Sequence, residues 1–411
     1  MKRVLLIAFH FPPVQGSSGV QRTLRFARYL PDFGWEPIVL TAHPRAYAET
    51  SDDQLKDIPP GVRVIRAPAW DSSRHLSIAG RYPGFLARPD RWMSWWLGAV
   101  PAGLKIIREF NPLAIWSTYP IATAHRIGGS LARLSALPWI ADFRDPMVDG
   151  DYPSDPAIRR SFEAIQANAI RRAACSTFTT PSALAMFRRQ FPERANHMAL
   201  LENGYDEETF AGQTATGRLH PERLTLLHSG VIYPSERDPT QLFAALRLLK
   251  ERAPAVLARL GVRFRAPIHF DLLADLARTY GVEDHVELAQ PVPYREALAE
   301  MLNADGLLIL QAANCNAQVP AKLYEYLRAR RPVLTLTDPA GDTAQVVRDA
   351  GIGALARLDD AADIASLLER FVAQPDAGTL PTEAAIRGAS RRGRTEALAG
   401  LLDRAVAHGG A

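Results

Sequence analysis

The amino-acid sequence predicts an α/β protein of two domains, each a doubly wound parallel sheet with helices on both faces. Three observations support this prediction. The chain has 411 residues, which is more than a single hydrophobic core usually organises. Short apolar runs alternate with longer amphipathic stretches, as is typical of strands buried on both faces. A polar segment with few apolar residues separates two series of these runs.

The first series of apolar runs predicts the strands of an N-terminal domain. The runs cover residues 4–9, 37–41, 62–66, 113–117, 138–142, 176–180 and 198–201. The opening run follows Lys2 and Arg3 and resembles the start of a signal peptide. It is short, however, and ends at His10 without a small-residue cleavage site, so we interpret it as a strand.

The second series predicts the strands of a C-terminal domain. Its runs cover residues 224–228, 268–272, 286–288, 306–310, 333–336 and 352–355. Turn-forming ENGYD (202–206) and small, polar AGQTATG (211–217) lie between the two series. We therefore expect an N-terminal domain at 1–205, a linker at 206–222, a C-terminal domain at 223–385, and a last helix at 386–411.

Composition narrows the functional classes only slightly. Basic and acidic residues number 48 and 44, a near balance that points to no particular anionic partner, and we expect no nucleic acid partner. Cys175 and Cys315 lack metal-type spacing and lie in apolar stretches, which predicts buried thiols in a reducing, cytoplasmic compartment. No window approaches the 18 apolar residues typical of a membrane span, so membrane contact would be peripheral.

The loop after the first strand is a candidate ligand loop. It contains Gly16 and Gly19 and leads into an amphipathic helix, whose free N–H groups suit an anion. A flexible turn is the alternative, but a position at the carboxyl end of a strand favours ligand contact. The loop is not G-x-G-x-x-G and no acidic residue follows the second strand, which disfavours an NAD-dependent enzyme.

A charged cluster follows the fifth strand. Asp142, Arg144 and Asp145 are costly at the end of an apolar strand unless they are paired or face water, so we expect them to point into a cleft. The aspartates could accept a proton or orient a hydroxyl, and Arg144 could hold an anion. A structural network of salt bridges is the alternative.

The segment 88–96 combines basic residues with three tryptophans. Such a segment could lie at a bilayer interface. We favour instead the interpretation that the tryptophans pack in the core or line a pocket.

Further candidates lie in the second half of the chain. Gly230 follows a strand, and Arg237 precedes a helix that begins near Thr240, a place suited to a diphosphate. Lys322 and Glu325 lie in PAKLYEYL, where Glu325 is expected to be partly buried and to contact a sugar hydroxyl. A surface glutamate paired with Lys322 or Arg328 is an equally good interpretation of the spacing.

Several motifs, in order, resemble one known family. They are PWIADFRDP (138–146), ENGYD (202–206), GVIYPSERDP (230–239), YGVEDHVELAQPVPYREALAEMLNADGLLIL (280–310) and PAKLYEYLRARRPVLTL (320–336). With the opening strand and its FPP turn, they resemble the GT-B glycosyltransferases of family 4, of the type found in bacterial polysaccharide biosynthesis. The resemblance covers nearly the whole chain.

The resemblance implies two facing Rossmann-like domains, with a nucleotide-sugar donor held by the C-terminal one and an acceptor by the N-terminal one. It implies that Arg237 contacts the donor diphosphate, that Glu325 binds ribose hydroxyls, and that Gly16 and Gly19 approach the phosphates or the sugar. Lys322 and Gly230 belong to the same donor set. Asp142 takes a position where many relatives have histidine, and it would orient or deprotonate the acceptor.

The implied reaction is glycosyl transfer, with retention, to a glycan or lipid-linked saccharide in surface polysaccharide or lipopolysaccharide assembly. We expect no metal and no cofactor beyond the donor. Many members carry a glutamate eight positions before the one matched by Glu325, whereas this chain has Ala317 there, followed by Gln318. A catalytically weak nucleotide-sugar-binding scaffold is therefore an alternative, and an epimerase or hydrolase on the same fold is a third.

Overall fold

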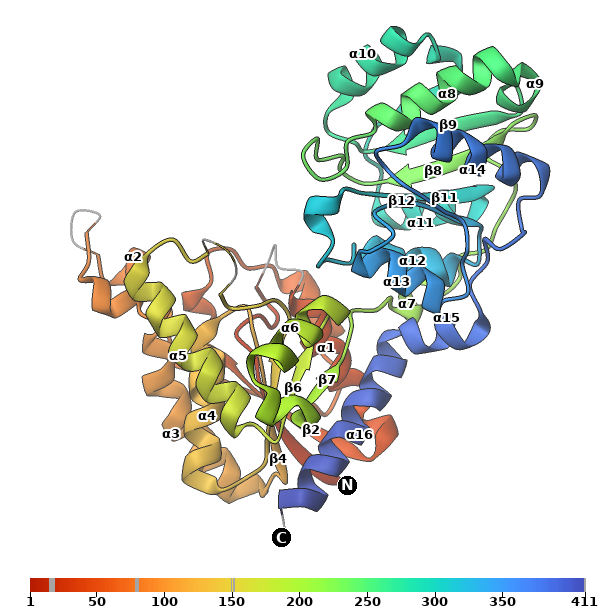
Figure 1. Ribbon diagram of the computed structural model, residues 1–411. Helices are drawn as coiled ribbons and strands as arrows, with labels where there is room; N and C mark the ends of the chain where they lie inside the picture. Colours follow the sequence, from red (N-terminus) through yellow and green to blue (C-terminus); the bar gives the residue numbers. More distant parts are fainter. Residues whose placement is uncertain (15–18, 78–80, 149, 151, 410–411) are drawn as a thin grey trace. The chain divides into compact units, whose positions relative to one another are not determined.

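A parallel sheet organises each of the two units into which the chain folds. The computed structural model describes residues 1–14, 19–77, 81–148, 150 and 152–409. The first unit comprises Met1–Asn203 and Arg391–Ala411, and the second comprises Gly204–Ser390 (Figure 1).

In the first unit, the described residues form a seven-stranded sheet in the order β3-β2-β1-β4-β5-β6-β7. Its strands are β1 (Lys2–Ile7), β2 (Trp35–Ala42), β3 (Arg63–Ala67), β4 (Ala114–Thr118), β5 (Trp139–Phe143), β6 (Cys175–Phe178) and β7 (Met198–Leu200). The helices are α1 (Gly19–Tyr29), α2 (Ser72–His75), α3 (Ser94–Phe110), α4 (Ala122–Ser135), α5 (Pro156–Arg172), α6 (Pro181–Gln190) and α16 (Arg391–Gly409). Because β1 pairs with both β2 and β4, the strand order reverses there, which is where such sheets bind ligands.

Alternation along β1 shows how the sheet is buried on both faces. Val4 and Leu6 pack in one apolar cluster with residues of α1 and α16, whereas Leu5 and Ile7 pack in another with residues of α3 and α4. All four side chains have no exposed surface. Two buried faces account for the continuous apolar character of this strand.

Helix α16 lies in the first unit, although it follows the second unit in the chain (blue beside red in Figure 1). Its Leu398 and Leu402 are fully buried in the same cluster as Val4 and Leu6. The carboxylate of Asp403 accepts a hydrogen bond of 3.0 Å from Trp35 Nε1. These contacts fix the helix to the face of the sheet that α1 also covers.

The second unit contains, within the described residues, a six-stranded parallel sheet in the order β10-β9-β8-β11-β12-β13. Its strands are β8 (Leu224–Ser229), β9 (Leu260–Arg265), β10 (Val286–Ala289), β11 (Gly306–Gln311), β12 (Val333–Thr337) and β13 (Leu355–Ala356). The helices are α7 (Glu207–Phe210), α8 (Thr240–Arg252), α9 (Pro254–Leu257), α10 (Phe270–Tyr280), α11 (Tyr294–Asn303), α12 (Lys322–Ala329), α13 (Asp342–Asp349), α14 (Ala361–Ala373) and α15 (Glu383–Ala389). Here the order reverses between β8 and β11. The prediction of two doubly wound parallel-sheet domains is confirmed.

One predicted strand of the second unit is wrong. The sequence predicts a strand at residues 268–272, but residues 270–272 form the first turn of helix α10, and the strand of this region is β9, which the sequence does not predict. Residues of β9 alternate between buried and partly buried positions. Its Arg263 and Arg265 interrupt the apolar run, and both form ion pairs with the buried Glu300. Because these two arginines lie on one face of β9, the sequence there lacks the continuous apolar run that indicates a buried strand.

The segment 206–222 belongs to the second unit in the structure. It contains α7, where Asp206 Oδ1 accepts a hydrogen bond of 3.3 Å from the Glu208 N–H and Phe210 is buried in the core of this unit. Across both units, the helices built from described residues include none with the length and apolar character needed to cross a membrane.

Candidate active site

Arg22 and Asp142 form a buried ion pair near the point where the first sheet reverses its strand order. Asp142 lies in β5, and its side chain has no exposed surface. Arg22 of α1 donates from Nε to Oδ2 over 2.9 Å and from Nη2 to Oδ1 over 2.7 Å. Thr118 and Thr177 each donate a hydroxyl hydrogen bond of 2.7 Å to the same carboxylate. All close partners of Asp142 thus lie inside the domain.

This arrangement corrects the expectation that Asp142 points into a cleft. Burial by itself would raise the pKa of Asp142, but Arg22, Thr118 and Thr177 together outweigh burial and lower it. The carboxylate is therefore held ionised by fixed partners. Its geometry matches the alternative of a structural salt-bridge network more closely than that of a base in contact with an acceptor.

Arg144 and Asp145 lie in different environments from Asp142. Asp145 is exposed, whereas Arg144 is half-buried and lines a small hollow with His10 and Tyr119. Arg144 Nε is buried, and the described residues provide no hydrogen-bond partner for it. Burial, followed by repulsion from Arg22, lowers the pKa of Arg144. A buried guanidinium donor of this kind is suited to an anionic group.

The hollow lies at the reversal point because its walls come from the loops after β1 and β4. His10 follows β1, and burial together with the nearby Arg144 lowers its pKa to about 4. At neutral pH the imidazole is therefore uncharged and able to accept a hydrogen bond. Gly19, the first residue of α1, also lines the hollow, while Gly16 lies outside the described residues.

In the second unit, Gly230 and Lys322 meet where β8 and β11 diverge. Gly230 follows β8 directly and has φ of +110°, and a Cβ added to it would lie 3.1 Å from Lys322 Nζ. Glycine tolerates this backbone conformation, and it leaves room for the lysine. Lys322 is the first residue of α12. The cation lies at the positive end of the helix dipole, and the two together favour an anion.

His228 and Arg237 complete the surroundings of Lys322. His228 is fully buried, and its Nδ1 lies 2.9 Å from the carbonyl of Leu308. Because that carbonyl can only accept, Nδ1 carries the hydrogen and Nε2 accepts from Lys322 Nζ over 3.1 Å. Burial, followed by the charge of Lys322, keeps the pKa of His228 well below its usual value, so the ring is neutral.

Burial and the nearby Arg237 lower the pKa of Lys322 to about 7. Arg237 itself donates to the carbonyl of Val231 over 2.9 Å and lies over the ring of Tyr233, 5.1 Å from its centre. Two cations that repel each other in a partly buried site favour a ligand with more than one negative charge. A diphosphate fits this requirement.

Glu325 lies one turn further along α12 and is half-buried, as expected. Its Oε1 accepts a hydrogen bond of 2.6 Å from the hydroxyl of Tyr294, the first residue of α11. Burial and the Glu325 carboxylate raise the pKa of Tyr294, which keeps this hydroxyl protonated as a donor. Of the two alternative partners, Arg328 binds Glu207 instead, whereas Lys322 interacts electrostatically with Glu325.

Ala317 lies at the position where many members of the family that this sequence resembles have a glutamate, and Gln318 follows it. Both are exposed, and the backbone carbonyl of Gln318 accepts hydrogen bonds from Gln311 Nε2 over 3.0 Å and from Thr343 over 3.1 Å. The side chains of Gln311 and Thr343 are also bonded to each other over 2.8 Å. Buried amide and hydroxyl groups therefore hold the Gln318 carbonyl, and Asn316 of the same loop donates to the Asp338 carboxylate over 2.7 Å.

Four residues of these sites were not singled out from the sequence: Arg22, His10, His228 and Tyr294. His10 and His228 each follow or end a predicted strand, and that position was a usable signal. Arg22 and Tyr294 lie on helices and meet partners 120 and 31 residues away in the chain. Only the fold brings those pairs together.

Two family models match different parts of the chain. A family model described as glycosyl transferase 4-like domain matches residues 18–204, and one described as glycosyl transferases group 1 matches residues 217–390. The chain is similar to a D-inositol 3-phosphate glycosyltransferase of Thermobispora bispora, with 24% identity covering 98% of this chain and 94% of that protein.

Two solved structures share the fold at low sequence identity. An α,α-trehalose 6-phosphate synthase from Burkholderia multivorans has a TM-score of 0.60 with 13% identity, over 99% of this chain and 98% of that one. Anabaena HepE in complex with UDP has a TM-score of 0.59 with 13% identity, over 97% and 95%. Both are GT-B structures, so the GT-B form of the two-domain fold is confirmed.

Proposed function

Because this chain belongs to the group 1 glycosyltransferases and carries an N-terminal domain of the glycosyl transferase 4-like type, we propose that it transfers a sugar from a nucleotide diphosphate sugar to an acceptor hydroxyl. The observation that carries the proposal is the cationic site of the second unit, where Arg237 and Lys322 lie beside the glycine turn at Gly230. HepE, with the same fold, was solved with UDP, which supports a nucleotide ligand.

The proposed site would act on the leaving group. As the bond between the sugar and the diphosphate breaks, negative charge grows on the phosphate oxygens. Arg237, protonated Lys322 and the positive end of the α12 dipole would stabilise this charge, since they are held in place before the reaction begins. Glu325 would accept hydrogen bonds from the ribose hydroxyls. No step requires a metal ion in this proposal.

In the first unit, we place the reacting hydroxyl of the acceptor at the hollow beside His10 and Arg144, whose volume of about 10 Å³ has room for one polar group rather than a whole saccharide. Neutral His10 would accept a hydrogen bond from the acceptor hydroxyl and orient it, and the Nε of Arg144, for which the described residues provide no partner, would bind an anionic or polar group of the same molecule. Asp142 would act through Arg22, by fixing α1 against β5.

We further propose retention at the anomeric carbon and an acceptor that is a glycan or lipid-linked saccharide of surface polysaccharide assembly. The curated relative is named for an inositol phosphate acceptor, so a phosphorylated polyol is the competing acceptor class, and Arg144 favours it. A non-catalytic nucleotide-sugar-binding scaffold is a second candidate function, favoured by Ala317 in place of a glutamate.

Calorimetric titration with UDP, GDP, dTDP and their sugar conjugates tests the proposal. We expect one nucleotide to bind wild-type protein, and Arg237→Ala to weaken it about 10- to 100-fold, the loss of one charge-assisted contact. Arg247→Ala, which removes an exposed arginine of α8 paired with Glu251, is the matched control and should bind as wild type does. Absence of nucleotide binding, or equal binding by Arg237→Ala, would contradict the proposal.

Turnover separates the two candidate functions. Release of the free nucleotide diphosphate that depends on an added acceptor supports a transferase. Full donor affinity with no turnover across glycan, lipid-linked and phosphorylated polyol acceptors supports the scaffold.

A further inference from the structure

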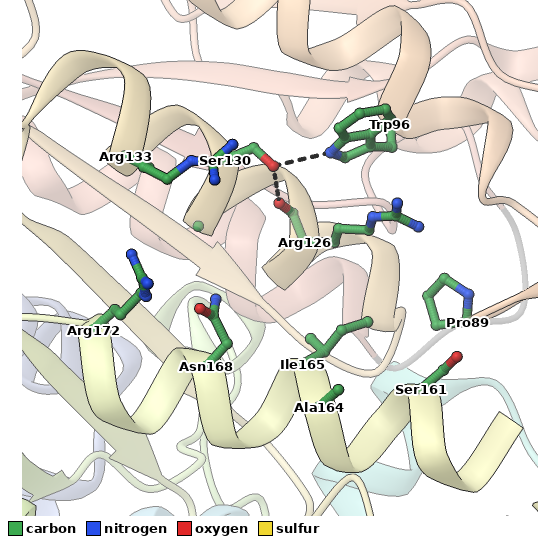
Figure 2. A pocket seen from close by; sticks show the side chains of 11 residues that line it. Pro89, Trp96, Arg126, Ser130, Arg133, Ser161, Ala164, Ile165, Asn168 and Arg172 are labelled. Carbon is green, nitrogen blue, oxygen red and sulfur yellow. Dashed lines mark hydrogen bonds between the residues drawn. The ribbon is translucent and has the colours of Figure 1, made fainter. Parts of the chain in front are cut away.

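A groove between three helices of the first unit lies apart from the proposed acceptor hollow. It has a volume of about 440 Å³ and is lined by residues of α3, α4 and α5, among them Trp96, Arg126, Arg133, Ile165, Asn168 and Arg172 (Figure 2). We call it the arginine groove. None of its lining residues belongs to the loops that follow β1, β4 and β5 in the described structure.

Arg126 is held in place by Trp96 of α3. Its guanidinium lies over the indole ring, 4.8 Å from the ring centre. The indole is fixed in turn, because its Nε1 donates to Ser130 Oγ over 3.0 Å and that hydroxyl donates to the Arg126 carbonyl over 2.8 Å (dashed in Figure 2). Cation–π contact and hydrogen bonds therefore preorganise this arginine without neutralising it.

Close packing of α4 and α5 shapes the floor of the groove. A Cβ on Gly129 would lie 3.1 Å from Asn168 Nδ2 and 3.2 Å from the ring of Trp139, so glycine permits this approach. In Figure 2, Asn168 and Arg172 extend from α5 toward α4. Arg133 and Arg172, both exposed, come from the two helices, and Arg126 lies on the same wall as Arg133.

None of the three arginines forms an ion pair within the described part of the chain, although Arg126 interacts electrostatically with the buried carboxylate of Asp90. No carboxylate oxygen of a described residue lies within 4.0 Å of Arg126, Arg133 or Arg172. By contrast, Arg159, on the same helix as Arg172, pairs with Glu163 over 3.3 Å. Three guanidinium groups therefore line one groove with no carboxylate at ion-pair distance, so a bound anion would meet positive charge there.

We propose that the arginine groove binds the phosphate group of an organic phosphate, separately from the donor and acceptor sites. Arginine forks match phosphate geometry, and Asn168 supplies a further donor. Ile165 and the indole of Trp96 offer apolar surface to the organic part of the ligand. The volume lies in the range of small-molecule sites. The phosphate belongs either to a water-soluble metabolite or to a phospholipid headgroup, and both present the same chemistry.

The test compares two double variants that each remove two positive charges. Arg133→Gln/Arg172→Gln changes the groove, whereas Arg108→Gln/Arg160→Gln changes exposed arginines of α3 and α5 that do not line it. Circular dichroism and Tm establish that both variants fold. Glucose 6-phosphate and inorganic pyrophosphate are titrated by calorimetry, and vesicles of phosphatidylcholine with and without phosphatidylglycerol are used for co-sedimentation.

We expect the groove variant to lose about tenfold or more in affinity for at least one of these probes, with the control variant close to wild type. If the groove variant loses affinity only for the soluble probes, the ligand is a metabolite. If it loses affinity only for vesicles with phosphatidylglycerol, the ligand is a phospholipid headgroup. The Arg237→Ala variant should still bind these probes. Failure of the proposed donor site can therefore be distinguished from failure of the arginine groove to bind phosphate. Equal losses in both double variants, no loss in the groove variant, or no binding of any probe by wild type would overturn the proposal.

Discussion

Arg22 of α1 and Asp142 of β5 form a two-pronged ion pair, with N–O distances of 2.9 and 2.7 Å, in which the Arg22 side chain is 3% exposed and that of Asp142 is fully buried. Arg22 also donates to the carbonyls of Leu201 and Glu202 over 2.8 and 3.0 Å. One guanidinium thus joins α1, β5 and the segment after β7. The pair is a fixed structural element beside the proposed acceptor hollow.

Removing one partner of this pair should destabilise the first unit. Arg22→Met leaves a buried, uncompensated carboxylate, so the free energy of unfolding should fall by about 3–5 kcal/mol. The double variant Arg22→Met/Asp142→Leu removes both charges and should recover part of that loss. Denaturant titration measures both. A stability of Arg22→Met equal to wild type would show that the pair is not coupled to folding.

Donor affinity should decrease as pH rises through 7. The pKa of Lys322 is about 7 in the folded protein and 10.5 for an ordinary lysine, so the unliganded lysine loses its charge between pH 6 and 8. Affinity for the nucleotide diphosphate requires that charge and should fall above pH 7, by at most about tenfold per pH unit. Calorimetry at several pH values in a buffer of constant ionic strength measures this fall.

Lys322→Arg is the matched control for that pH dependence. Arginine stays protonated throughout this range, and titration of the ligand's own phosphate is common to both proteins. The difference between the two profiles therefore isolates Lys322. Parallel profiles for wild type and Lys322→Arg would contradict a role of lysine protonation in donor binding.

Recognition of ribose by Glu325 can be tested with deoxynucleotides. Glu325→Gln should weaken a ribonucleotide diphosphate about tenfold while affecting its 2′-deoxy analogue much less, because the analogue lacks one hydroxyl that the carboxylate would accept from. Tyr294→Phe removes the 2.6 Å hydrogen bond to Glu325 and should have a smaller effect of the same kind. An equal loss for both nucleotides would place Glu325 elsewhere than at the ribose.

Gly230→Ala should impair both stability and donor binding. At φ of +110° a side chain is strained, and the new Cβ would lie 3.1 Å from Lys322 Nζ, so we expect a loss of about 1–3 kcal/mol in unfolding free energy. Gly217→Ala is the control, since its Cβ would meet no atom within 4 Å and φ there is not positive. Thermal unfolding and calorimetry distinguish the two. If Gly230→Ala resembles Gly217→Ala in both measurements, the turn does not constrain the site.

The sequence predicted those parts of the fold that depend on local patterns. Runs apolar on both faces located β1 to β8 within a few residues, and loops at the ends of strands led to Gly230, Arg237 and Arg144. The sequence did not predict β9, because Arg263 and Arg265 are stabilised there by ion pairs with Glu300 that no local pattern reveals.

Residue chemistry in the site was less predictable than residue position. The sequence predicts that Asp142 is paired or faces water in a cleft, and the structure pairs it with Arg22, on a helix 120 residues earlier in the chain. Which cation meets which carboxylate depends on the order of strands in the sheet. The same limitation applies to Lys322, whose neighbour His228 lies 94 residues away.

The membership of α16 in the first unit has a consequence for biosynthesis. The second unit, Gly204–Ser390, interrupts the first in the chain, so a ribosome must translate all of it before Leu398 and Leu402 can cover the sheet. Until then, Trp35 lacks its partner Asp403, and apolar side chains such as Leu6 lack part of their cover. Because translation proceeds from the N-terminus to the C-terminus, the second unit can fold completely before the first. Until α16 is synthesised, the first unit keeps an uncovered apolar face that chaperones can bind.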